Sequence, residues 1–144
     1  MERLFNDGWR FVKLPFGSTL DDAKAADWNP VELPHDWLIA QADDLYETGD
    51  GWYRRTFAVE NPDDGLVRIL RFDGVYMDCD VLVNEQIVAT HRYGYTAFDV
   101  DLTPHLRSGG NSIMVHIRHQ SPNSRWYSGA GIYRDVTLHT LPAR

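Results

Sequence analysis

The amino-acid sequence predicts an all-β domain built as an antiparallel β-sandwich. Apolar and polar residues alternate with a period of two along most of the chain, which is typical of strands with one buried face. Turn-forming clusters separate about eight such segments at intervals of roughly 8 to 12 residues, and the helix-strand alternation of a parallel sheet is absent. The 144 residues are enough to bury a normal core, so we expect a single domain, residues 1–144.

One segment near the N-terminus, residues 19–26, favours a helix. Ser18 or Thr19 is suited to cap its first turn, because a hydroxyl oxygen accepts hydrogen bonds from free backbone N–H groups. Asp21 and Asp22 suit the positive end of the helix dipole. The segment is short, so we expect the helix at the periphery of the sandwich.

The strands are predicted from alternation and from β-branched or aromatic residues. They cover residues 52–59, 66–72, 78–83, 86–91, 98–102, 113–118 and 136–138. In the third of these segments Cys79 and Val81 share one face, and we expect that face to be buried.

Turn signals separate these strands. Residues 61–65 (NPDDG) form a turn, and Asn84 with Glu85 is compatible with a tight hairpin. Residues 103–104 (TP) are typical of the start of one helical turn. Residues 109–111 (GGN) are predicted to form the last turn before a strand.

Charge and composition exclude several classes of partner. The chain has 14 Lys and Arg against 21 Asp and Glu, a net charge of −7, which argues against binding to nucleic acid or an anionic membrane. No apolar run is long enough to span a membrane, and no apolar leader follows Met1. The single cysteine, Cys79, excludes an internal disulfide. We expect a cytoplasmic location, unless residues before Met1 have been removed.

The acidic residues do not predict catalysis. A glycosidase needs two cooperating carboxyl groups, but the adjacent acids at 21–22, 43–44 and 63–64 lie in turns or at a helix start and point to different sides. Asp78 with Asp80, and Asp99 with Asp101, each share a strand face that could hold Ca²⁺, although a solvent face explains them equally well. No further ligand accompanies either pair. We therefore predict no catalytic residue and no metal site in this chain.

The loop before the last strand differs from the other loops in composition. It gathers Asn123, Arg125, Trp126 and Tyr127 next to glycines. Aromatic rings stack on the apolar faces of sugars, and amide or guanidinium groups bind vicinal hydroxyls, so this combination favours a sugar-binding loop. The alternative is structural, with both aromatic rings closing the end of the sandwich and Arg125 paired with an acid such as Asp78.

Several motifs, in their order and spacing, resemble the N-terminal sugar-binding domain of family-2 glycoside hydrolases. They are FNDGWRF (5–11), LPHDW (33–37), GWYRRTF (51–57), FDGVY (72–76), GYTAF (94–98) and NSRWYSGAGIYRDV (123–136). The last motif is the most specific of them, and it is more similar to β-galactosidases than to β-glucuronidases or β-mannosidases. The resemblance covers essentially the whole chain.

The resemblance implies a jelly-roll, galactose-binding-domain-like sandwich that precedes an immunoglobulin-like domain and a (β/α)₈ barrel. The two catalytic glutamates of the family lie on that barrel, which needs about 250 residues and is absent here. The chain would then be part of a larger retaining glycosidase and would not hydrolyse a substrate alone. The resemblance implies no cofactor in this chain, Mg²⁺ or Na⁺ near the barrel of the parent enzyme, and often a homo-oligomer.

The resemblance also implies which residues contact a β-galactoside. Tyr76 and Asn123 stand at the two sugar-contacting positions, where better-known relatives hold Asn and Asp. Arg125 and Trp126 are the next candidates, for orienting a hydroxyl or an acid and for stacking, and Asp78 is a further one. Two alternatives are a free-standing carbohydrate-binding module and an architectural sandwich that holds an oligomer together.

Overall fold

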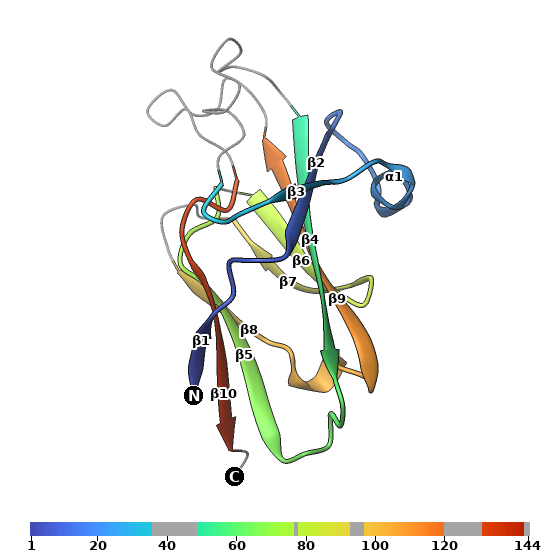
Figure 1. Cartoon of the computed structure of the whole chain (residues 1–144). Coiled ribbons are helices and arrows are strands. Elements are labelled where there is room, and N and C mark those ends of the chain that lie inside the picture. The colour runs from blue at the N-terminus through green and yellow to red at the C-terminus, as the bar shows by residue number, and fades with distance from the viewer. Residues whose placement is uncertain (36–48, 77, 93–96, 120–130, 143–144) are drawn as a thin grey trace.

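The described part of the chain forms two antiparallel sheets packed face to face. The computed structural model describes residues 1–35, 49–76, 78–92, 97–119 and 131–142 (Figure 1). Within these residues one sheet has four strands and the other has six. The all-β sandwich that the sequence predicts is confirmed.

Each sheet combines strands from distant parts of the chain. The four-stranded sheet is ordered β1 (Glu2–Leu4), β10 (Val136–Pro142), β5 (Leu66–Phe72) and β8 (Phe98–Asp101). The six-stranded sheet is ordered β3 (Asn29–Val31), β2 (Trp9–Leu14), β4 (Gly49–Val59), β9 (Gly109–His119), β6 (Asp78–Val83) and β7 (Gln86–His91). Helix α1 (Leu20–Ala25) lies between β2 and β3 of the six-stranded sheet, and the 3₁₀ turn η1 (Thr103–His105) lies between β8 and β9, which belong to different sheets.

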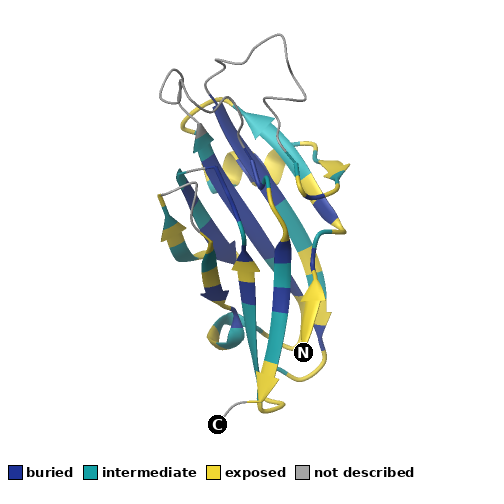
Figure 2. Cartoon of the chain, turned by 90° about the vertical axis from the view of Figure 1, so that its left-hand side faces the viewer, coloured by how far each residue is buried: buried dark blue, intermediate teal, exposed yellow. Residues whose placement is uncertain are grey.

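The core lies between the two sheets, where the inner strand faces are buried (Figure 2). The predicted buried face of β6 is confirmed, because Cys79 and Val81 are both fully buried in this core. Burial raises the pKa of the Cys79 thiol to about 12, so this cysteine remains a neutral apolar side chain at physiological pH. Leu70 and Phe72 of β5 face it from the other sheet.

Three strands and one turn differ from the sequence prediction. The alternation did not indicate β1, β2 or β3, and β4 begins at Gly49, three residues before the predicted start. The turn predicted at 109–111 is wrong, because β9 already begins there, with Gly109 paired to Val59. Backbone hydrogen bonds along β4 extend the ladder through these glycines, and a ladder needs no side chain.

The hairpin predicted at Asn84 and Glu85 is confirmed. Both residues have positive φ angles, 50° and 71°, as a two-residue turn that matches the twist of its strands requires. The Asn84 side chain donates to the His105 carbonyl at 3.0 Å and accepts from the Ser112 N–H at 3.0 Å. These contacts tie the hairpin to β9 and η1.

Helix α1 covers the outer face of the six-stranded sheet. Thr19 caps it as predicted, since its hydroxyl oxygen accepts the Asp22 N–H at 3.2 Å while the Asp22 carboxylate accepts the Thr19 N–H at 2.9 Å. Ala23 is fully buried against Trp52, Leu82 and Met114 in a second, smaller core. Among the described residues, no helix is long and apolar enough to cross a membrane.

Replacing Thr19 with Ala removes the oxygen that accepts the Asp22 N–H. We expect the free energy of unfolding to fall by about 1 kcal/mol in urea titrations. Thr19→Ser keeps the oxygen and should lose clearly less. Equal losses in the two variants would contradict the capping role.

Candidate functional site

Three points at which the chain enters or leaves the described part are joined by hydrogen bonds at one end of the sandwich. Tyr76 and Gly131 form a two-bond antiparallel bridge, with N···O distances of 2.9 and 3.1 Å. The His35 N–H donates to the Ile132 carbonyl at 2.8 Å. These hydrogen bonds hold His35, Tyr76 and Gly131, which border parts of the chain outside the described residues, close together.

Gly131 is at the centre of this cluster, and no other residue fits there. Its φ of 137° is a conformation that residues with a side chain rarely adopt. A Cβ atom on Gly131 would lie 2.5 Å from the His35 carbonyl oxygen and 2.6 Å from the Tyr53 hydroxyl oxygen. The sequence therefore needs glycine here to let the backbone pass between His35 and Tyr53.

A small aromatic cluster on the six-stranded sheet lies next to Gly131. Tyr53 of β4 is fully buried, and its hydroxyl oxygen is 2.6 Å from His35 Nδ1, a hydrogen bond. The Phe11 ring of β2 lies 4.9 Å from the His35 ring and 4.8 Å from the Tyr53 ring, measured between centroids. Two strands of the sheet thus fix the position of His35, where the chain leaves toward residues 36–48.

The predicted sugar-contacting residues fall into two groups. Asn123, Arg125 and Trp126 lie outside the described residues. Tyr76 is part of the bridge to Gly131 and is 5% exposed, so its side chain packs into this end of the domain. Asp78 follows on β6, on the outer face of the six-stranded sheet.

Asp78 and Asp80 are held by arginines. Arg118 of β9 donates to Asp80 Oδ2 at 2.8 Å and to Asp78 Oδ1 at 3.2 Å. Arg92 also donates to Asp78 Oδ1 at 3.2 Å, and the Thr90 hydroxyl donates to Asp80 Oδ1 at 2.8 Å. A cation bound by these carboxylates would have to displace the guanidinium of Arg118, so the arrangement fits an ion-pair network rather than a Ca²⁺ site.

The charges of this network stabilise one another. Burial raises the pKa of Asp80, but the hydrogen bonds from Arg118 and Thr90 outweigh it, so the pKa lies below the ordinary value of 3.8. The hydrogen bond to Asp80 is also the main reason why the pKa of Arg118 is raised, against the effect of its own burial. Both groups are therefore charged over the whole physiological range.

Sequence reasoning missed a second, buried polar group beside this network. His116 Nε2 lies 2.8 Å from Asp50 Oδ2, and Asp50 is fully buried. Ser18 donates to the same oxygen from its N–H at 3.1 Å and its hydroxyl at 2.8 Å. Alternation placed His116 and Arg118 on one face of a strand, but only the pairing of β4 with β9 brings Asp50 to them.

A polar depression of about 610 Å³ adjoins the same end of the sandwich. Asp73, Tyr133, Arg134 and Asp135 line it, and the Asp73 N–H donates to the Asp135 carbonyl at 3.0 Å. Gly74 is needed beside it, because a Cβ atom there would lie 2.9 Å from the Tyr133 ring. The sequence did not indicate these four residues as site residues, although they belong to the motifs FDGVY (72–76) and NSRWYSGAGIYRDV (123–136).

Comparison with known proteins identifies the family. Residues 8–142 match the model of the sugar-binding domain of family-2 glycosyl hydrolases. The chain belongs to this family. It is 40% identical to β-galactosidase BoGH2A of Bacteroides ovatus and 30% identical to a β-glucuronidase of Bacteroides fragilis, over 93% and 94% of its length. It covers only 17% and 20% of those two proteins.

Solved structures of the family share the fold. A family-2 glycosyl hydrolase from Bacteroides cellulosilyticus matches 96% of this chain with 34% identity and a TM-score of 0.77. A β-glucuronidase from Bacteroides uniformis matches 99% of it with 31% identity and a TM-score of 0.80. The chain covers 20% and 18% of these two structures, about a fifth of each. The sandwich is thus the sugar-binding domain of the family.

Replacing Gly131 with Ala forces a Cβ atom against the His35 carbonyl and the Tyr53 hydroxyl. We expect a loss of unfolding free energy of about 1–3 kcal/mol beyond the cost of the φ angle alone, measured by urea unfolding. Gly17→Ala is the matched control, because Gly17 has a φ of 91° and nothing within 4 Å of its Cβ position. If both variants lose the same free energy, the close approach is not the reason for glycine at 131.

The Asp80 network predicts a dependence of stability on pH. The pKa of Asp80 is lower in the folded than in the unfolded state, so its contribution is fully present above the unfolded value of 3.8 and is lost as pH falls through the folded value. The free energy of unfolding, measured from about pH 5 downward, should fall less steeply in Asp80→Asn than in the wild type. Asp63→Asn, at an exposed turn residue, should keep the wild-type slope.

Proposed function

We propose that this domain contributes loops to the terminal-sugar subsite of a retaining glycoside hydrolase similar to β-galactosidases, with the catalytic barrel downstream in the same polypeptide. The observation that carries the proposal is the cluster of His35, Tyr76 and Gly131, which joins three connections at one end of a sugar-binding sandwich. The small share of its relatives that the chain covers supports the downstream barrel.

In this proposal the domain positions the sugar and performs no acid-base chemistry. Asn123 and Arg125 would orient hydroxyls of the terminal ring, and Trp126 would stack or pack against it. Tyr76, which is buried, would contribute by holding the backbone at Gly131 beside the sugar. Asp78 would act from the outer face, oriented by Arg118 and Arg92. Holding the ring where the barrel glutamates meet its anomeric carbon accelerates the reaction through orientation.

The preferred substrate is a β-galactoside. The relative with 40% identity is named a β-galactosidase, and the motif at 123–136 resembles β-galactosidases more than β-glucuronidases. A β-glucuronide is the second candidate, because a relative with 30% identity and a solved structure with 31% identity are named β-glucuronidases. We assign no cofactor to this domain and place any Mg²⁺ or Na⁺ of the parent enzyme near its barrel.

The first measurement is the intact mass of the native polypeptide that contains this sequence. We expect a mass several times 16.6 kDa, because a barrel alone needs about 250 residues. A mass near 16.6 kDa would leave a free-standing carbohydrate-binding module and would refute the hydrolase assignment.

The full-length protein then tests the subsite. Asn123→Ala and Arg125→Ala should lower kcat/KM for p-nitrophenyl β-galactoside by about tenfold or more, while the unfolding temperature stays unchanged. Arg10→Ala, an exposed arginine on β2, is the control and should have wild-type kinetics. A fall in unfolding temperature with normal kinetics would favour the structural interpretation of the loop. Faster hydrolysis of the matching β-glucuronide would identify the second substrate.

A further inference from the structure

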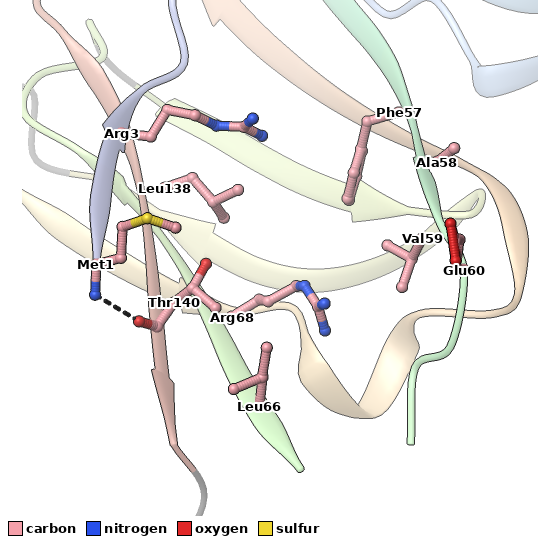
Figure 3. Close-up of a pocket in the computed structure, with 10 residues that line it drawn as sticks. All are labelled: Met1, Arg3, Phe57, Ala58, Val59, Glu60, Leu66, Arg68, Leu138 and Thr140. Carbon is pink, nitrogen blue, oxygen red and sulfur yellow. Dashed lines mark hydrogen bonds between the residues drawn. The ribbon is translucent and has the colours of Figure 1, made fainter. Parts of the chain in front are cut away.

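A pocket opens between the two sheets at the end of the sandwich away from the candidate site. Its volume is about 330 Å³, the size of one or two large side chains. Strands β1, β10 and β5 form one wall, and the end of β4 forms the other (Figure 3). Figure 3 shows Leu138 and Leu66 on one side and Phe57 and Val59 across from them, with the guanidinium groups of Arg3 and Arg68 extending between the walls.

The pocket exists because the inner face of the four-stranded sheet changes from apolar to polar there. Leu138 pairs with Leu70, and both are buried in the core. Two residues further, on the same face, Thr140 pairs with Arg68. Arg68 donates to Asp64 at 2.7 Å and its guanidinium extends toward the wall formed by Phe57 and Val59, so a charged side chain stands here in place of the apolar side chains of the core.

Of the apolar residues that line this pocket, Val59 and Leu138 are buried, whereas Phe57 and Leu66 are partly exposed and can accept a further apolar contact. Beside them, Arg3 is exposed, and its guanidinium carbon lies 5.8 Å from the Phe5 ring centroid. Among the described residues, no carboxylate forms an ion pair with Arg3. A polypeptide segment would match this pocket if it carried an apolar side chain for the apolar lining and, next to it, a carboxylate that pairs with Arg3.

We propose that this pocket is a docking site for the polypeptide that follows residue 144 in the full-length protein, which inserts an apolar side chain between the sheets and pairs an acidic residue with Arg3. The inference rests on the proposed function, in which further domains follow this one. It concerns the end of the sandwich opposite the sugar loops and is a contact within one polypeptide.

The course of β10 favours this occupant over a free partner. Leu138 and Thr140 of β10 line the pocket, and the strand ends at Pro142, so the continuing chain starts within a few residues of the opening. Each further residue reaches at most about 3.5 Å, which keeps the next segment close. Such a tether gives an effective concentration in the millimolar range, far above that of a separate protein.

Photo-cross-linking in the full-length protein tests the proposal. Leu66, a partly exposed residue of the pocket wall, is replaced with p-benzoylphenylalanine, and the cross-linked peptides are mapped by mass spectrometry after irradiation. We expect a link from position 66 to a residue beyond 144, at the mass of one chain. Ile87, which is 62% exposed on β7 of the other sheet, is the control position and should give at least tenfold less of this product.

Other outcomes overturn the proposal. A product at twice the chain mass would show that a second copy fills the pocket, and links confined to residues 1–144 would show that nothing downstream enters it. Arg3→Glu provides an independent test, because it should lower the unfolding temperature of the full-length protein while Arg10→Glu leaves it unchanged. If the protein has the expected mass and hydrolyses glycosides but shows neither effect, the docking site is wrong and the proposed function stands.

Discussion

The pairing of β4 with β9 is the constraint on which the rest of this domain depends. The two strands pair over eleven residues each, from Gly49 with His119 to Val59 with Gly109. One end of this ladder adjoins the cluster around His35 and Gly131, and the other end forms a wall of the pocket between the sheets. The candidate site and the proposed docking pocket therefore lie at the two ends of one strand pair.

Side chains alternate between the two faces of this ladder, and the two faces contact different parts of the domain. Tyr53 and Val115 are paired and point into the main core, while their neighbours Trp52 and His116 lie on the outer face. There the Trp52 and His116 rings stack, with centroids 3.8 Å apart and planes within 9°. The inner face thus holds the sheets together, and the outer face builds the polar network beneath helix α1.

Arg118 of this polar network also contacts the ring of His116. Arg118 Nη1 lies 3.5 Å from His116 Nδ1, and because a guanidinium has only donors, Nδ1 must accept. On its other side the ring is hydrogen-bonded through Nε2 to Oδ2 of the buried Asp50, at 2.8 Å. Removing one partner of a buried charge is strongly destabilising, so this chain of contacts keeps the strand ends in place.

The sequence predicts the sandwich well where one strand face is buried and the other is exposed. It fails for β2, because Trp9 packs into the main core while Val12 and Leu14 pack under α1, so both faces are apolar. Strands β1 and β3 have only three residues each, too few to show a period, and are defined by their pairing partners. Short edge strands of this kind depend on tertiary contacts.

The sequence predicts which residues of the candidate site share a strand face, but it does not predict their partners on other strands. The shared face of Asp78 and Asp80 follows from alternation, but their partner Arg118 is known only once the register of β6 with β9 is known. The contact of Asp50 with His116 spans 66 residues of sequence, and no local pattern encodes it. The motif FDGVY did indicate Tyr76, whereas its bridge to Gly131 depends on the fold.

The same contacts determine which hydrogen-bond partners the described carboxylates near the candidate site have. A retaining glycosidase needs two carboxyl groups about 5–5.5 Å apart, one that can donate a proton and one that can attack the sugar. Near the candidate site, the described carboxylates are each bound to a donor of the domain itself: Asp73 to Arg71, Asp78 and Asp80 to Arg118, and Asp135 to Asn6. An arginine partner lowers the pKa of a carboxyl group, as it does for Asp80, and so opposes the protonated state that a general acid requires. These contacts agree with the proposed function, in which the carboxyl groups that perform the acid-base chemistry lie on the downstream barrel and the sandwich holds the loops of the subsite.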